Sequence, residues 1–115
     1  MIFVRITMIA LLEKQLEIKQ TLMSMIEPML KASRCTSYAV LSHIENLNRF
    51  SIIGEWETRE DLDNYFASHR FGILLGTRAL LSEPIKIQID TVIRSENLDA
   101  AQLARSNRPG ASHND

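Results

Sequence analysis

Apolar and polar residues alternate with two different periods along the first 93 residues. From Ile2 to Ile9 the period is two, which predicts a strand whose apolar face carries Ile2, Val4, Ile6 and Met8. From Leu12 to Lys31 the period becomes helical, and the buried side is expected to carry Leu12, Leu16, Leu22, Met23, Ile26, Met29 and Leu30. Because proline lacks a backbone donor, Pro28 is expected to kink or end this helix.

The middle of the chain predicts a hairpin followed by a capped helix. Strands are expected over Thr36 to His43 and Phe50 to Trp56, with the turn Glu45-Asn46-Leu47-Asn48 between them. Thr58, followed three residues later by Asp61, matches a capping box, so a helix is expected to start there. Its buried face is expected to carry Leu62, Tyr65 and Phe66.

A helix break and a last strand are expected in the remaining part. Ser68 to Arg70 interrupts the helical pattern, which resumes over Phe71 to Leu81. Gly72 and Gly76 are expected to leave a smooth strip where a neighbour packs closely. After Pro84, one strand face carries Ile85, Ile87, Ile89, Thr91 and Ile93. The order β-α-β-β-α-β predicts an α+β, ferredoxin-like fold with a four-stranded antiparallel sheet and its helices on one side.

The pattern divides the chain into a domain over residues 1–93 and a tail over 94–115. The tail has no aromatic residue, and its large aliphatic residues are Leu98 and Leu103, so it can bury little surface. A short helix is possible over Leu98 to Ala104, and the chain is expected to be loose from Ser106 onward.

The sheet face without helices is expected to hold several large apolar side chains. Such an exposed face favours association. Two sheets packed face to face would form a homodimer with a barrel-like core, so the partner expected for the chain is a second copy of itself.

Composition excludes several functional classes. Of 115 residues, 45% are hydrophobic and 23% are charged, the mixture of a soluble globular protein. The formal charge of -1 gives no field that attracts nucleic acid or an anionic membrane, and no segment has the apolar length of a membrane helix. A single cysteine, Cys35, indicates a reducing, cytoplasmic compartment. The three histidines, His43, His69 and His113, show no metal-ligand spacing, so no metal is expected.

Several motifs resemble one family. They are Gly54-Glu55-Trp56-Glu57-Thr58-Arg59-Glu60-Asp61-Leu62, then Tyr65-Phe66-Ala67-Ser68 with Phe71, then Leu80-Leu81 before the isoleucine-rich strand. Together with the element order, they resemble the antibiotic biosynthesis monooxygenase domain over residues 2–93. Arg34-Cys35 resembles the family's Gly-Cys junction, without its glycine.

The resemblance implies a dimeric α+β barrel and an oxidoreductase activity. Members of this family include monooxygenases that use no metal, flavin or haem, so no cofactor is expected. An ionised phenol or hydroquinone reduces dioxygen directly, while the protein desolvates and orients it and accepts a proton. The implied ligand is a hydroquinone-like or polyketide-like aromatic. A non-catalytic dimeric module that binds a small hydrophobic ligand, or serves only as an assembly partner, is the alternative.

The resemblance also implies site residues. Trp56, Tyr65 and His69 are the candidate catalytic residues. Tyr65 stands where many members have a histidine, and a phenol with an unperturbed pKa of about 10 is a poor base at neutral pH. His69, next to Arg70 at the position of a second family histidine, is therefore the candidate proton acceptor. Each also has a plain structural interpretation: core packing for Trp56 and Tyr65, and a solvated or capping side chain for His69.

Candidate substrate contacts surround these three residues: Phe66, Phe71, Leu75, Arg78 and Arg5. Leu75 lies where haem-degrading relatives carry an axial histidine, so haem degradation is not expected. Either Arg5 or Arg78 could hold an anionic oxygen, although a salt bridge with Glu55 or Glu57 is the simpler role for both.

Overall fold

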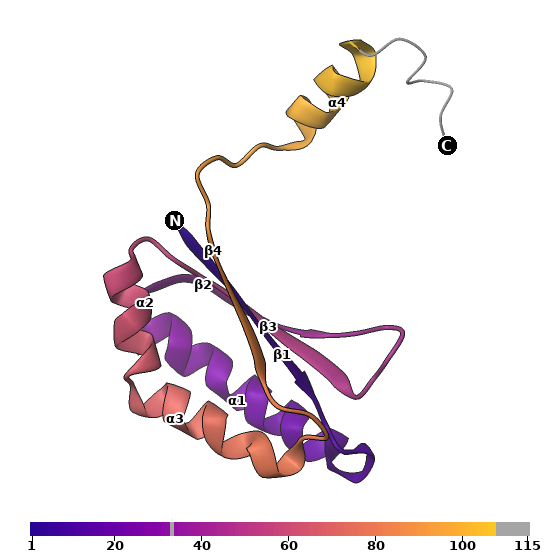
Figure 1. Ribbon diagram of the computed structural model, residues 1–115, viewed down its shortest axis with the longest axis vertical. Helices are drawn as coiled ribbons and strands as arrows, with labels where there is room; N and C mark the ends of the chain where they lie inside the picture. The colour runs from indigo at the N-terminus through magenta and orange to yellow at the C-terminus, as the bar shows by residue number, and fades with distance from the viewer. Residues whose placement is uncertain (33, 108–115) are drawn as a thin grey trace.

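A four-stranded antiparallel sheet organises the chain in a computed structural model, which describes residues 1–32 and 34–107 (Figure 1). Its strands are β1 (Ile2–Ile9), β2 (Cys35–Ser42), β3 (Arg49–Trp56) and β4 (Lys86–Thr91), in the order β2-β3-β1-β4. All pairings are antiparallel. The order of strands and helices confirms the predicted ferredoxin-like fold.

Three helices cover one face of this sheet (Figure 1). They are α1 (Gln15–Ala32), α2 (Arg59–Phe66) and α3 (His69–Gly76). Short 3-10 segments precede α1, over Leu12–Lys14, and follow α3, over Thr77–Leu80. Between sheet and helices lies the core, in which β1 contributes its predicted face and the helices contribute Ile18, Leu22, Met29, Leu62 and Leu74.

The buried face of α1 differs from the predicted one. Leu12, Leu16, Met23 and Leu30 are exposed by 79%, 64%, 56% and 50%. Leu22 and Met29 are buried and Ile26 packs beside them, as predicted, while Ile18 and Met25 complete the face that packs on the sheet. This helix has more apolar residues than one face can bury, so periodicity alone selects some of the wrong ones. Pro28 does not end the helix, which runs on to Ala32. Both Pro28 and Ser24, whose carbonyl loses its partner, are exposed, so water can bind that carbonyl.

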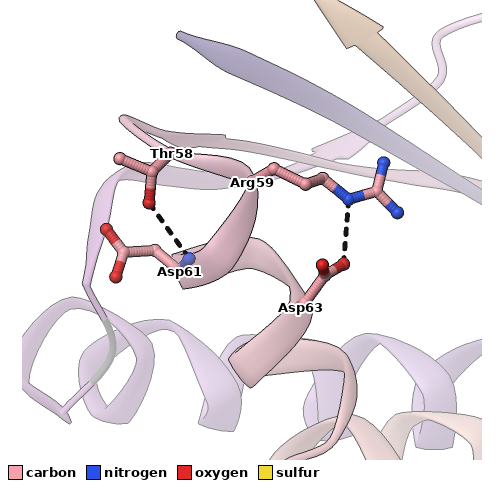
Figure 2. A network of polar contacts seen from close by, with 4 residues as sticks. All are labelled: Thr58, Arg59, Asp61 and Asp63. Atoms are coloured by element: carbon pink, nitrogen blue, oxygen red, sulfur yellow. Dashed lines mark hydrogen bonds and ion pairs between the residues drawn. The ribbon is translucent and has the colours of Figure 1, made fainter.

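Local signals fixed the hairpin and the start of α2. The turn between β2 and β3 is closed by hydrogen bonds from Arg49 N to Asn46 O, 2.9 Å, and from Asn48 N to Asn46 Oδ1, 3.0 Å. At the start of α2, Thr58 Oγ1 accepts a hydrogen bond from Asp61 N at 3.1 Å, as the capping box predicts (Figure 2). One turn further, Arg59 and Asp63 form an exposed ion pair at 2.8 Å (Figure 2).

Two expectations for the last third of the domain are wrong. A Cβ atom added at Gly72 or Gly76 would meet no atom of the described residues within 4 Å, so none of them packs closely on these glycines. Ile93 lies outside β4 and is 97% exposed. All six residues of β4 are exposed, because β4 is an edge strand that pairs with β1 beyond the cover of the helices.

The chain ends, within the described residues, in a fourth helix. Helix α4 (Leu98–Asn107) projects away from the sheet (Figure 1). It forms where a short helix was predicted but extends through Ser106, where the sequence suggested a loose tail. Residues 108–115, with His113, lie outside the described residues, and the domain boundary at residue 93 stays a prediction. Within the described chain, no helix combines the length and apolar character that crossing a membrane requires.

Candidate active site

Five of the chain's aromatic residues gather where β2, β3, α2 and α3 meet. Trp56 is 1% exposed and stacks on Tyr65, with ring centroids 5.2 Å apart and planes at 26°. Phe71 meets the Tyr65 ring edge-on at 5.3 Å, and Phe66 lies 5.9 Å from it. Tyr38 comes from β2, beside Gly54 of β3. The ring of Tyr65 is therefore held by aromatic contacts with three neighbours.

Gly54 makes room for the tryptophan. It lies two residues before Trp56 on the same face of β3, and the indole ring folds back over it. A Cβ atom at position 54 would lie 2.7 Å from both Cη2 and Cζ3 of Trp56. The absence of a side chain at Gly54 thus lets the indole lie against the sheet, and the indole in turn supports Tyr65.

A pocket of about 380 Å³ opens beside this cluster. Its volume lies within the ~300–1,000 Å³ typical of small-molecule sites. Helix α1 contributes one wall and α3 the other, with the two tyrosines between them; the lining residues are Thr21, Ser24, Met25, Pro28, Met29, Tyr38, Tyr65, His69, Arg70 and Ile73. The lining combines apolar side chains with a few polar groups, which suits an apolar ligand that carries one or two oxygen atoms.

The two tyrosines present their hydroxyl groups as hydrogen-bond donors. Burial raises the pKa of Tyr38 to about 12. Burial also raises the pKa of Tyr65, and the nearby Tyr38 raises it further. Both phenols therefore stay protonated at neutral pH and cannot serve as bases there. The hydroxyls are close enough to influence each other, yet the Tyr38 hydroxyl is buried and makes no hydrogen bond of normal geometry.

Ser68 places the polar residues of α3 at the pocket. Its hydroxyl donates to the carbonyl of Tyr65 at 2.6 Å and accepts from the backbone N–H of Phe71 at 3.3 Å. The same side chain thus ends α2 and caps α3. His69 and Arg70, the first residues of α3, reach the pocket as a result. The side chain of His69 is exposed, so it stands at the mouth rather than at the base.

The structure brings together only some of the predicted site residues. Tyr65 and His69 line the pocket, while Trp56 supports Tyr65 from behind. Phe66 and Phe71 pack against Tyr65 and each other outside the lining. Leu75 and Arg78 are exposed and do not line the pocket.

Arg5 lies on the other side of the sheet. There it borders a separate hollow with His43, whose Nε2 is hydrogen-bonded to Ser51 Oγ at 2.9 Å. The ion pairs between described residues involve neither Arg5 nor Arg78, so the expected salt bridges with Glu55 or Glu57 are absent there.

Tyr38 lines the pocket although the sequence did not indicate this role. The available signal was a tyrosine on the face of β2 that alternates toward the helices, because a buried tyrosine usually needs a partner for its hydroxyl. Cys35, three residues earlier, donates its S–H to the carbonyl of Ser37, and burial raises the pKa of its thiol. A raised pKa disfavours the thiolate, so Cys35 is not an activated nucleophile. The described residues contain no cluster of three metal-binding side chains.

A match to a family model identifies the protein family of this chain. The model described as antibiotic biosynthesis monooxygenase matches residues 1–72, which include Trp56, Tyr65 and both residues at the start of α3. The chain belongs to the antibiotic biosynthesis monooxygenase family. Membership indicates a monooxygenase-type role and confirms the resemblance noted in the sequence. No curated protein matches the chain.

Solved structures share the fold of this family member. A Deinococcus radiodurans protein, provisionally assigned as an antibiotic biosynthesis monooxygenase, is 17% identical and superposes with a TM-score of 0.77 over 84% of this chain and 97% of its own. Rv0793 from Mycobacterium tuberculosis is 15% identical, with a TM-score of 0.75 over 84% and 98%. A conserved protein from Methanosarcina mazei Go1 is 27% identical, with a TM-score of 0.71 over 77% and 89%.

Proposed function

We propose that the chain is a monooxygenase that oxidises a hydroquinone-like or polyketide-like aromatic with dioxygen and without a metal or organic cofactor. Family membership supports the reaction class. The observation that carries the substrate class is the pocket itself, a cavity of about 380 Å³ whose lining combines apolar side chains with the two protonated tyrosines. A flat aromatic body would lie between α1 and α3, with an oxygen atom toward the tyrosines.

The proposed reaction is balanced by dioxygen as the oxidant, shown here for an anthrone. A base removes a proton, and the resulting anion gives one electron to dioxygen. The radical pair combines, so that a carbon–oxygen bond forms and a peroxide results. Protonation of the peroxide, followed by loss of water with the remaining hydrogen of that carbon, breaks the oxygen–oxygen bond. The product is a ketone, which keeps one oxygen atom, and the other leaves as water.

His69 is the proposed proton acceptor. Among the polar groups of the pocket, Tyr38 and Tyr65 are donors at neutral pH and Arg70 is always protonated. The imidazole of His69 is the remaining side chain of the described lining with a ring nitrogen that can accept a proton. Tyr65, supported by Trp56, would then orient the substrate oxygen. His69 and Tyr65 thus remain the candidate catalytic residues, and Trp56 positions Tyr65.

Oxygen uptake with dihydroxynaphthalenes and anthrones, without added metal or flavin, tests the proposal. His69→Ala is expected to lower kcat about tenfold, with little change in KM. The loss is expected below the ~100-fold typical of a general base because His69 is exposed and water can replace it. Arg78→Ala, on the adjoining 3-10 segment but outside the pocket, is the matched control and is expected to keep full activity.

Three outcomes separate the candidate functions. Oxygen uptake that falls in His69→Ala and not in Arg78→Ala supports the proposal. Uptake that is equal in all three proteins contradicts the role of His69. Saturable binding of these aromatics without any uptake supports the alternative, a non-catalytic dimeric module that binds a small hydrophobic ligand or serves as an assembly partner.

A homodimer through the open face of the sheet is a further part of the proposal. This face, opposite the helices, carries partly exposed Phe3, Ile9 and Ile53. We expect sedimentation at micromolar concentration to give twice the 13.1 kDa chain mass. Ile53→Asp should give a monomer, whereas Ile87→Asp, on the helix side of β4, should leave the dimer intact. A stable wild-type monomer would contradict this part of the proposal.

The proposal also covers the domain boundary and the location of the protein in the cell. The functional domain comprises residues 1–93, with residues 94–115 as an appended tail that carries α4. The location is cytoplasmic, because a single thiol, Cys35, forms no internal disulfide and suits a reducing compartment.

A further inference from the structure

The hydroxyl of Tyr38 is buried without a well-formed hydrogen bond to the described part of the chain. The residue is 7% exposed, its hydroxyl oxygen is buried, and that oxygen makes no hydrogen bond of normal geometry with the described residues, although the hydroxyl of Tyr65 is near. Leaving a buried hydroxyl unpaired costs about 1–3 kcal/mol relative to a paired one. A phenylalanine would fill the same space without this cost, so the hydroxyl gives the unliganded fold no benefit. Such a group is a candidate for use by a ligand.

The position of Tyr65 shows how Tyr38 can act. Tyr65 lines the same pocket, and aromatic contacts with Trp56 and Phe71 hold its ring. The two hydroxyls influence each other, but their present geometry is not that of a hydrogen bond. A phenol has one O–H donor and can accept through its oxygen. If Tyr38 donates to Tyr65, the O–H of Tyr65 is left for a ligand.

We propose that Tyr38 is a positioning residue for the ligand of this pocket. When an aromatic ligand binds with a phenolate or carbonyl oxygen at Tyr65, the Tyr65 O–H donates to that oxygen and the Tyr38 O–H donates to Tyr65 Oη. This chain of two hydrogen bonds satisfies the buried Tyr38 hydroxyl and polarises the bond to the ligand. The inference rests on the proposed function in one respect, namely that the ligand occupies the same pocket.

The surrounding groups favour an acceptor oxygen on the ligand. The titratable and charged residues that line the pocket are Tyr38, Tyr65, His69 and Arg70, and the wall contributed by α1 carries none. Arg70 is a cation, and both tyrosines are protonated donors at neutral pH. Carboxylates are absent from the described lining, so nothing there repels a phenolate. Donors that bind an ionised phenol lower the pKa of that phenol.

The probe for the test is 4-nitrophenol, whose phenolate is coloured and whose nitro group makes it a poor substrate for oxidation. In the wild-type protein, the bound probe is expected to ionise at lower pH than the free probe. Tyr38→Phe is expected to weaken binding of the phenolate about three- to tenfold, the range for one hydrogen bond. It should also move ionisation of the bound probe back toward that of the free probe.

Two comparisons distinguish positioning from a structural role. Tyr38→Phe is expected to leave the free energy of unfolding unchanged or higher, because the hydroxyl it removes has no partner in the unliganded protein. In the Tyr65→Phe background, Tyr38→Phe should cause no further loss of probe binding, because Tyr38 acts through the hydroxyl of Tyr65. A thermodynamic cycle over the four proteins measures this coupling.

Three results would overturn the proposal: wild-type protein without saturable binding of 4-nitrophenol, Tyr38→Phe with unchanged binding and unchanged ionisation of the probe, or equal losses from Tyr38→Phe in both backgrounds. Since the probe is not oxidised, these results are independent of oxygen uptake. A protein that binds the probe through both tyrosines but consumes no oxygen would refute the proposed oxygenase and leave the role of Tyr38 intact.

Discussion

Replacing Gly54 by alanine is expected to lower the free energy of unfolding by about 2 kcal/mol, within the range for overfilled cores. The new Cβ atom would lie 2.7 Å from two carbon atoms of the Trp56 ring, closer than carbon atoms can approach. A flexible surface side chain would turn away at little cost. Trp56 cannot, because it is 1% exposed and stacked on Tyr65. The indole must move, and Tyr65 must move with it.

Gly72→Ala is the matched control for this substitution. Nothing lies within 4 Å of a Cβ atom at Gly72, which is an exposed position inside α3. Alanine there is expected to stabilise the protein by about 0.5–1 kcal/mol, since glycine loses more backbone freedom in a helix. Urea denaturation compares both variants with the wild type. Equal effects of the two substitutions would show that backbone freedom, and not the indole, dominates at position 54.

A second substitution can assign the cost at Gly54 to the indole. Trp56 is the only tryptophan of the chain, so its fluorescence reports on this site alone. In Gly54→Ala the emission is expected to shift toward that of a more solvated indole. Trp56→Phe removes the ring atoms that clash, so Gly54→Ala should cost less in that background than in the wild type. Additive costs would contradict the proposed clash.

Local sequence signals were sufficient for the hairpin, the cap at Thr58 and the break near Ser68, although α3 begins at His69 and not at Phe71. Each depends on atoms a few residues apart: Thr58 Oγ1 and Asp61 N, or the Ser68 hydroxyl and the backbone on both sides of it. Such contacts form wherever the residues occur in that order. The same local signals placed Tyr65 and His69 near each other, because Ser68 joins the helices that carry them.

The packing side of α1 and the pocket role of Tyr38 depend on contacts across the fold. Leu16 and Ile18 are equally apolar, and only the position of the sheet buries one and exposes the other. Tyr38 and Tyr65 are 27 positions apart, on a strand and a helix that meet only in the folded chain. The alternation of residues in β1 places Arg5 on one face of the strand, but it does not indicate which face the helices cover. Arg5 was therefore expected at the site, whereas it borders a separate hollow.

Alkaline conditions are expected to destabilise the wild-type protein more steeply than Tyr38→Phe. An unfolded tyrosine has a pKa of about 10, and burial raises the pKa of Tyr38 to about 12 in the folded protein. Between these values the folded state keeps the proton while the unfolded state releases it. The folded state then binds more protons, so stability falls as pH rises, by about 1.4 kcal/mol per pH unit for each such tyrosine. Below pH ~10 both states keep the proton, so the stability that is lost at higher pH is fully present there.

Urea denaturation at about pH 9, 10 and 11 measures this slope in both proteins. Other groups titrate in the same range in both proteins, so the difference between the two curves reports Tyr38 together with its effect on the pKa of Tyr65. Tyr65 remains in the variant, and its own raised pKa should keep part of the slope. Parallel curves over the whole range would contradict the burial of the Tyr38 hydroxyl.

Native-state absorbance gives an independent measurement, because the chain has two tyrosines and both line the pocket. Tyrosinate absorbance of the folded protein should stay low through pH ~10 and rise only as the protein unfolds. A rise centred near the value of a free phenol would mean that water reaches the pair. The same burial that makes these hydroxyls costly at high pH keeps them protonated at neutral pH, where Tyr65 can donate to a bound aromatic oxygen and Tyr38 can donate to Tyr65.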